Sequence, residues 1–333
     1  MPKERASVKD VAQLAGVSVG TVSNVLNRPE AVARRTREKV EAAMAELRFV
    51  RNASARQLRA GVSTTVGAVL LDLGNPFYTE IARGIEDRLA VEGHTLMVCS
   101  SDEDEAREGH FLRQFAEQGV RGLLVTPMPG TPQRLADLAA LGIPSVLVDS
   151  RSTVLPSVGV DHVAGGRQAI AHLLERGHRR ILFITAAQEL QQSRHRLRGA
   201  LEAVRAAGLE PAEVLHPSSL TALTAAEGEQ AMAAALDGPG PAPTAVFCIN
   251  DLVALGAIRA IRARGLTVPG DVAVVGYDDL YWAGELATPL SSVRQPMRQL
   301  GWAAADLLLG SDDAGQLVFT PELVVRASSD IDR

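Results

Sequence analysis

The most specific chemistry in this sequence lies in residues 7–27, SVKDVAQLAGVSVGTVSNVLN. The second half of this segment is rich in short hydroxyl and amide side chains, which can contact the base edges and phosphates of a DNA duplex. Asn24 can read adenine bidentately or hold a phosphate, whereas Val19 offers only methyl contact and Gly20 has no side-chain donor. The residues expected to face DNA here are Ser18, Val19, Gly20, Thr21, Ser23, Asn24 and Asn27.

Two short helices joined by a tight turn must position these side chains. Ser7 is expected to cap the first helix with Asp10 as the capping-box acid, and Gly16 is expected to end it in a left-handed conformation. Ser18 then caps the second helix. The expected inward-facing residues are Val8, Val11, Ala12, Ala15, Val22, Val25 and Leu26. This pattern is typical of a helix-turn-helix that reads a major groove; the alternative is an ordinary surface αα-hairpin.

Positive charge is concentrated at the N-terminus. Residues 1–62 contain 12 Lys and Arg against 6 Asp and Glu, a formal net charge of +6. Residues 63–333 contain 22 against 33, a net charge of −11. A basic head on an acidic body is expected where only the head contacts phosphate. The distribution favours DNA binding by residues 7–27 over the plain hairpin.

A third helix and a linker follow. The segment TREKVEAAMAELRF is predicted to be a helix with Thr36 as its N-cap. Residues 51–61, RNASARQLRAG, are good helix formers, but they carry too little apolar surface for a stable isolated helix. We expect a linker that becomes ordered on contact with a partner.

Length and composition limit the remaining possibilities. A chain of 333 residues can form two or three domains. No apolar run approaches the roughly 20 residues of a membrane span. The N-terminus MPKERASVKD lacks the apolar core of a signal peptide, so we expect a cytoplasmic protein without membrane contact. Cys99 and Cys248 lie in apolar runs far apart, which indicates buried thiols rather than a disulfide or a metal pair.

From residue 65 onward, apolar runs alternate with amphipathic helical segments. The expected strands are TVGAVLLD, HTLMVCS, RGLLVTP, IPSVLVD, HRRILFIT, PTAVFCIN and DVAVVGYD. The expected helices are Tyr78–Glu92, Glu103–Gln118, Arg134–Leu141, Gly165–Arg176, His195–Ala207, Glu227–Leu236 and Leu252–Arg264. This alternation predicts doubly wound parallel α/β sheets in two similar halves that meet near residue 160. Ligands bind such sheets at the carboxyl ends of the strands, so the cleft between the halves is the expected pocket.

In this order, the segments resemble the lac repressor (LacI/GalR) family of bacterial transcription regulators over essentially the whole chain. The head carries DVAQLAGVS, TVSNVLN and TREKVEAAMAEL at the spacing of that family. The body motifs are NPFY, RGHRRI, Arg196-x-x-Gly199, IND, GDVAVVGYDD and PLSSVRQP. Each body motif is weak by itself, but their order behind this head is specific.

The resemblance implies a ligand-responsive regulator, most often a repressor, that binds a near-palindromic operator in double-stranded DNA as a homodimer. Residues 52–59 correspond to the hinge helix of the family, and Leu58 to the side chain that wedges between central base pairs. The alternative for Leu58 is packing on the body. Arg56 and Arg59 are candidates for the minor groove or its phosphates.

The resemblance also implies a small-molecule effector, such as a sugar, a nucleoside or base, or another small metabolite. Asn75-Pro76 is a typical helix start, which would place Phe77 and Tyr78 at the mouth of the cleft. The matching effector-contact positions are Arg196, Asn250, Asp251 and Asp278, with Asp149, Asp161 and Trp282 as further candidates. An arginine opposite carboxylates and an amide suits a hydroxylated or anionic ligand. For any one of these side chains the alternative is a capping or turn-stabilising role, and for Trp282 it is packing in a loop.

The implied fold is an all-α helix-turn-helix head with a hinge helix, then two doubly wound parallel-sheet α/β subdomains like those of type I periplasmic binding proteins. The expected domains are a head over 1–50, a hinge over 51–62 and a body over 63–333. Within the body we expect one subdomain over about 63–160 plus 291–318, and the other over about 161–290 plus 319–330.

Two rival functions fit the sequence less well. A solute-binding protein would explain the body, but not the basic head. An enzyme would need a catalytic constellation, and the G-x-S-x-G match at residues 16–20 lacks the preceding strand that a nucleophile elbow requires. The sequence contains neither a G-x-G-x-x-G nor a Walker A run, and its histidines lack metal-ligand spacing, so we expect no cofactor and no metal.

Overall fold

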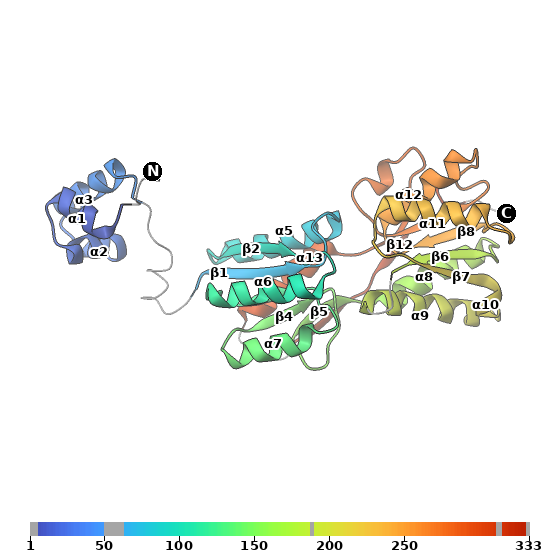
Figure 1. The fold of residues 1–333 in the computed structure, drawn as a ribbon, viewed down its shortest axis with the longest axis horizontal. Helices are drawn as coiled ribbons and strands as arrows, with labels where there is room; N and C mark the ends of the chain where they lie inside the picture. Colours follow the sequence, from blue (N-terminus) through green and yellow to red (C-terminus); the bar gives the residue numbers. More distant parts are fainter. Residues whose placement is uncertain (1–5, 50–62, 187–189, 311–314, 331–333) are drawn as a thin grey trace. The chain divides into compact units, whose positions relative to one another are not determined.

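The computed structural model describes residues 6–49, 63–186, 190–310 and 315–330. The chain divides into two compact units, the first ending at Ser63 and the second beginning at Thr64. Figure 1 shows a helical head in blue and an α/β body in the remaining colours. The predicted hinge contacts Arg56, Leu58 and Arg59 lie outside the described residues.

The head is a helix-turn-helix followed by a third helix. Its elements are α1 (Val8–Ala15), α2 (Val19–Asn27), the 3-10 turn η1 (Pro29–Ala31) and α3 (Arg34–Glu46). The predicted capping box is present, because the Asp10 N–H donates to Ser7 Oγ (3.3 Å) and the Ser7 N–H donates to the Asp10 carboxylate (2.7 Å). Gly16 ends α1 at φ +65°, which only glycine adopts without strain.

Apolar residues from all three helices form the core of the head. The buried members are Val11, Ala12, Val22, Val25, Val40 and Ala43. The prediction of Thr36 as a cap is wrong, since α3 begins at Arg34 with Ala33 at the N-cap position and no side-chain cap. Good helix formers at 34 and 35 extend the helix toward its N-terminus, which places Thr36 inside the first turn.

The body contains two six-stranded sheets within the described residues. We call the first, with its helices, the N lobe. Its strands in spatial order are β11 (Gln316–Phe319), β5 (Ser157–Val160), β4 (Ser145–Val148), β3 (Leu123–Val125), β1 (Thr65–Leu70) and β2 (Thr95–Ser100), all parallel. Separate apolar clusters on the two faces pack against α5 (Pro76–Val91) with α13 (Met297–Leu309), and against α6 (Glu105–Glu117) with α7 (Thr131–Ala140).

The second sheet and its helices form the C lobe. Its strands in spatial order are β12 (Glu322–Val324), β10 (Ser291–Arg294), β9 (Ala273–Asp278), β8 (Ala245–Cys248), β6 (Ile181–Thr185) and β7 (Leu215–Ser219). Only the β10–β12 pairing among these described strands is antiparallel. The helices are α8 (His162–Glu175), α9 (Gln191–Ala206), α10 (Pro211–Val214), α11 (Ala225–Asp237), α12 (Asp251–Ala263) and the 3-10 turn η2 (Ala283–Glu285).

Within the described residues, the chain passes between the lobes after β5, after β10 and after β11. The second crossing differs from the expected boundary at 290/291. β10 pairs in parallel with β9 and therefore belongs to the C lobe, so the chain crosses after Arg294. This strand contains the buried polar residues Ser291 and Ser292, so it does not form an apolar run that the sequence pattern would reveal.

The seven predicted strands of the body are present, and the strands that the sequence did not reveal lie mostly at sheet edges. The edge strand β7 reads LHPSS and is largely exposed. β2 is also an edge strand. The sequence predicts that it is buried on both faces, but in the structure it is only partly buried. Cys99, which lies in β2, is accordingly only partly buried, whereas Cys248 is buried. Among the described residues, no helix is long and apolar enough to cross a membrane.

Pairs of glycines bring three pairs of helices into close contact. In α8 and α9, a Cβ built on Gly166 would lie 2.1 Å from the Arg196 carbonyl oxygen, and one on Gly199 would lie 1.9 Å from the Val163 carbonyl oxygen. The same reciprocal arrangement joins α5 to α13 and α11 to α12. The glycines of these two contacts are Gly84 with Gly301 and Gly228 with Gly256.

The variant Gly199→Ala is expected to lower the free energy of unfolding by about 3 kcal/mol, because its methyl group overlaps backbone that cannot move independently of α8. Urea denaturation measures this. Gly240→Ala is the control, since a Cβ there meets no atom within 4 Å. Equal stability of the two variants would contradict the close helix contact.

Candidate functional site

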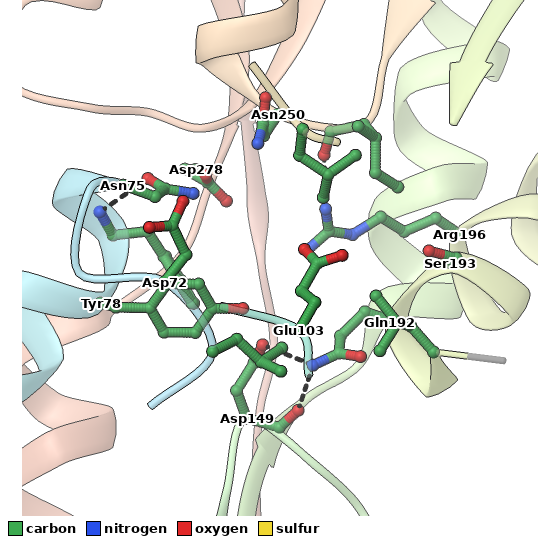
Figure 2. Close-up of a pocket in the computed structure, with 15 residues that line it drawn as sticks. Asp72, Asn75, Tyr78, Glu103, Asp149, Gln192, Ser193, Arg196, Asn250 and Asp278 are labelled. Carbon is green, nitrogen blue, oxygen red and sulfur yellow. Dashed lines mark hydrogen bonds between the residues drawn. The ribbon is translucent and has the colours of Figure 1, made fainter. Parts of the chain in front are cut away.

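A cavity lies between the two lobes, at the carboxyl ends of their strands (Figure 2). This is the place where open parallel sheets bind ligands. The residues that line it are Leu71, Asp72, Asn75, Phe77, Tyr78, Glu103 and Asp149 from the N lobe, with Leu190, Gln192, Ser193, Arg196, Leu223, Ile249, Asn250 and Asp278 from the C lobe.

The start of α5 forms one wall of the cavity. The Asn75 side chain accepts a hydrogen bond from the Phe77 N–H (3.0 Å), and Pro76 occupies the first helical position. This cap places Phe77 and Tyr78 side by side, with their ring centroids 4.9 Å apart in an edge-on arrangement. Burial, reinforced by Asp149 and other nearby carboxylates, raises the pKa of the Tyr78 phenol well above its ordinary value. Tyr78 is therefore a neutral hydroxyl at the cavity wall.

Asn250 combines a cap with a free donor. Its Oδ1 accepts a hydrogen bond from the Val253 N–H (2.8 Å) at the start of α12. Its Nδ2 is buried and has no hydrogen-bond partner among the described residues. Figure 2 shows this nitrogen directed toward the cavity. A buried unpaired donor is costly, so Nδ2 is suited to an acceptor on a ligand.

Arg196 is held rigidly on the C-lobe wall. Its guanidinium carbon lies 3.6 Å from the centre of the Tyr277 ring, a cation–π contact, and Nη1 donates to the Ile249 carbonyl oxygen. His162 Nδ1 lies 3.5 Å from Nη2. The side chain is only 5% exposed, so its orientation is set before any ligand arrives.

Carboxylates outnumber cations in the cavity, where Arg196 is the single cationic side chain among the lining residues. Glu103, Asp149 and Asp278 lie at φ +59°, +54° and +107°, a region that strains residues other than glycine and is concentrated at functional sites. Burial raises the pKa of Glu103, with Asp72 adding repulsion, and burial also raises the pKa of Asp278 well above its ordinary value. The raised pKa values favour the neutral, protonated form of these two carboxyl groups, which can donate as well as accept hydrogen bonds.

Asp149 is held by groups outside its own lobe. His162 Nε2 lies 3.1 Å from Oδ1, and Gln192 Nε2 donates to Oδ2 (3.0 Å). His162 Nδ1 lies 3.2 Å from the Tyr277 hydroxyl. Burial lowers the pKa of His162 despite the neighbouring carboxylate, which favours a neutral imidazole that donates to Asp149.

Six of the nine side chains expected at the effector site line the cavity: Phe77, Tyr78, Asp149, Arg196, Asn250 and Asp278. Asp161, Asp251 and Trp282 do not, and structural contacts occupy them instead. Asp161 caps α8 through the Ala164 N–H (3.0 Å). Trp282 packs against the apolar clusters of both lobes.

Asp251 is buried beneath the cavity. Its carboxylate accepts hydrogen bonds from the Leu280 N–H (2.8 Å) and the Ser292 hydroxyl (2.6 Å). Asp251 is the first residue of α12, next to the cap, and its side chain bonds to groups of the C lobe instead of lining the cavity. Adjacent positions in IND therefore have different roles, which the sequence pattern could not separate.

Several lining residues were not expected from the sequence. Asp72 lies two residues after the end of β1, and Glu103 lies three residues after the end of β2. The rule that ligands meet the carboxyl ends of strands could therefore have identified both. Gln192 and Ser193 lie in the first turn of α9, and no sequence signal marks them.

In the head, the expected DNA-facing side chains divide into two groups. Val19, Gly20 and Asn24 are exposed on α2 and available to a partner. Ser18 caps α2 through the Thr21 N–H (3.1 Å), and Asn27 Nδ2 donates to the Ser23 carbonyl oxygen (2.9 Å). These bonds tie the second group to the helix itself, which suits positioning more than base reading.

The N-terminus of α3 is locally unfavourable in isolation. It has no side-chain cap and no acidic residue in its first turn, where Arg34 and Arg35 lie instead. Cations near a helix N-terminus oppose the helix dipole. Arg34 is paired with Glu38 (2.8 Å), and Arg35 has no ion pair among the described residues of the head. Such a positive surface is suited to an external polyanion.

A helix-turn-helix head joined to a two-lobed body with a cavity at its strand ends defines a ligand-responsive DNA-binding regulator. Residues 7–52 match the family of bacterial regulatory proteins called the lacI family, and residues 170–329 match the periplasmic binding protein-like domain. The chain belongs to the lacI family of regulators.

The chain is similar to transcriptional regulators over almost its whole length. The chain is 34% identical to the HTH-type transcriptional repressor PurR of Aliivibrio fischeri strain ES114, covering 97% of this chain and 98% of that protein. It is 36% identical to the ribose operon repressor of Bacillus subtilis, covering 92% and 91%. A lac repressor dimer solved with operator and the anti-inducer ONPF has a TM-score of 0.83 at 31% identity, covering 98% and 99%.

A complex of the transcriptional regulator CelR with cellobiose is also similar. Its TM-score is 0.71 at 34% sequence identity, and the match covers 97% of this chain and 100% of that one.

Asp251 is expected to make the stability of the body dependent on pH. Burial raises its pKa to about 7, so from about pH 4 to about pH 7 the folded chain holds a proton that the unfolded chain releases. The stabilisation present below about pH 4 is therefore lost as the pH rises through 7, by at most about 4 kcal/mol. Chemical denaturation at a series of pH values should show this slope.

Asp251→Asn should remove that part of the slope, because the amide does not titrate. Asp137→Asn, at an exposed site on α7, is the control and should leave the slope unchanged. An Asp251→Asn profile that parallels the wild type would rule out Asp251 as the titrating group.

Proposed function

We propose that this protein acts as a homodimer, binding a near-palindromic operator with one head per half-site, and that a small molecule in the cavity controls its affinity for the operator. The main support is that one chain contains both features: a basic head with an exposed face on α2, and a cavity into which Asn250 Nδ2 offers an unpaired donor. The similar lac repressor structure, a dimer with operator, supports this assembly.

The cavity chemistry favours an uncharged, polyhydroxylated effector. Four carboxyl groups can exchange hydrogen bonds with ligand hydroxyl groups, while Asn250 Nδ2 and Arg196 provide further donors. The excess of carboxyl groups over the single arginine disfavours an anionic ligand. The sequence had left both a hydroxylated and an anionic effector open. The similar CelR complex contains a sugar of this chemical kind, cellobiose.

Effector binding and operator binding must be reciprocally coupled. A ligand that contacts both walls of the cavity changes the relative stability of the lobe arrangements, and linkage requires operator DNA to change the ligand affinity by the same factor. Coupling of this kind typically amounts to about 1–3 kcal/mol. Whether the effector induces or co-represses depends on which arrangement it prefers.

The first test separates regulation from solute binding or catalysis. Operator binding by the full-length chain is compared with binding by residues 63–333 in a fluorescence anisotropy titration, with and without mono- and disaccharides, cellobiose included. We expect a sugar to shift the operator affinity of the full chain, and we expect no DNA binding without the head. Turnover of the sugar, or operator binding by the body alone, would contradict the proposal.

Asn250 allows the cap and the ligand contact to be separated. Asn250→Ser retains a capping oxygen for the Val253 N–H but removes the donor into the cavity, so it should abolish the sugar response and leave operator binding and stability intact. Asn250→Ala loses the cap as well and should cost about 1 kcal/mol of stability. A normal sugar response in Asn250→Ser would exclude Asn250 as a ligand contact.

Two head variants distinguish base reading from phosphate contact. Asn24→Ala should lower affinity for the operator by about 1–3 kcal/mol relative to unrelated DNA. Arg35→Ala should weaken binding to all sequences alike and reduce the salt dependence by about one phosphate contact. Operator titrations at several salt concentrations measure both effects. A sequence-independent loss in Asn24→Ala would assign that side chain to the backbone instead.

A further inference from the structure

Two consecutive glutamines at the start of α9 in the C lobe reach across the cleft to the segment after β4 in the N lobe. Gln191 Oε1 accepts a hydrogen bond from the Arg151 N–H (2.8 Å), and Gln191 Nε2 donates to the Arg151 carbonyl oxygen (2.9 Å). Gln192 Nε2 donates to the Asp149 carbonyl oxygen (3.1 Å) and to Asp149 Oδ2 (3.0 Å). We call this set of contacts the glutamine clasp.

The clasp is not a by-product of capping. The N-cap position of α9 is Leu190, which makes no side-chain cap, and the two amides bond across to the other lobe. Figure 2 shows the Gln192 amide directed at Asp149. Gln191 pairs with both backbone groups of one residue, as a neighbouring strand would, and two such bonds fix the direction of approach as well as the distance.

Burial makes the Gln192 contacts sensitive to opening of the cleft. Gln192 is 8% exposed and Asp149 is 1% exposed. Separation of the lobes would replace these bonds with water, whereas removal of the amide with the lobes together would leave the Asp149 oxygens short of a donor. Asp149 also lies at φ +54°, a conformation that its surroundings must maintain.

The remaining oxygen of Asp149 extends the clasp to a crossing between the lobes. His162 Nε2 lies 3.1 Å from Asp149 Oδ1, and His162 begins α8 directly after the chain leaves the N lobe. Asp149 is thus held from α9 on one side and from the crossing on the other.

We propose that the glutamine clasp holds the two lobes together when the cavity has no ligand, so that Gln191 and Gln192 set the resting population of the closed arrangement. A protein that is already largely closed requires less differential affinity from its effector to complete the shift. This consequence for the effector rests on the proposed function; the clasp itself does not.

The test replaces the glutamines with methionine, which retains side-chain volume and removes the hydrogen bonds. The variants are Gln191→Met, Gln192→Met and both together, in the full-length chain without ligand or DNA. Gln114→Met is the matched control, because the Gln114 amide bonds to Glu117 on the same helix of one lobe (3.0 Å). Each clasp variant should lower the closed-to-open ratio by roughly tenfold.

Single-molecule fluorescence energy transfer reports the ratio. Dyes are attached at Asp137→Cys on α7 and Arg205→Cys on α9, two exposed positions in different lobes, in a Cys99→Ser background. We expect a new population with a different transfer efficiency in the clasp variants, largest in the double variant, and a wild-type distribution in Gln114→Met.

Hydrogen exchange of the Arg151 amide gives an independent measurement. Arg151 is exposed, and its N–H is bonded to Gln191 Oε1, so its protection reports the clasp directly. Exchange should be about tenfold faster or more in Gln191→Met and also faster in Gln192→Met. The second effect distinguishes lobe opening from loss of a single bond.

Unchanged transfer distributions together with unchanged Arg151 exchange in Gln192→Met would overturn the proposal. Circular dichroism checks that each variant is folded, and the single variants carry the test if the double variant is not. Because neither measurement uses effector or operator, failure of the clasp and failure of the regulatory function give different results.

Discussion

The constraint on which the rest of this structure depends is the meeting of two parallel sheets by their carboxyl ends. Parallel strands and the helices that follow them leave unpaired backbone donors at that edge, and these donors need partners. Asn75, Asp161 and Asn250 satisfy them as caps. Two such edges face each other across the interlobe cleft, where Asn75 and Asn250 both cap a helix and line the cavity.

Each lobe is well suited to move as a rigid body. The reciprocal glycines of α8 with α9, α5 with α13 and α11 with α12 bring helix backbones into direct contact, which leaves little freedom within a lobe. The lobes are joined by the chain crossings and by polar contacts across the cleft. A regulator needs this division, because a small molecule can bias a two-state arrangement far more effectively than it can deform a packed core.

Charge distinguishes the head from the body. In the basic head, the first turn of α3 has no side-chain cap and no acidic residue. In the cavity of the acidic body, burial and the neighbouring Asp72 raise the pKa of Glu103. In both places the chain carries a local electrostatic cost. Local inconsistency of this kind is expected at functional sites rather than in a structural core.

Local interactions determined much of this protein directly from its sequence. The capping box at Ser7, the left-handed Gly16 and the Asn75-Pro76 helix start depend only on neighbouring residues, so the head and the main strand–helix order could be predicted. The tertiary structure alone decided which polar residues face the cavity, since Asp251 and Asn250 are adjacent in sequence yet one is buried beneath the site. It also placed β10 in the C lobe and Gln191 opposite Arg151, because long-range pairing across two lobes leaves no periodic signal in the chain.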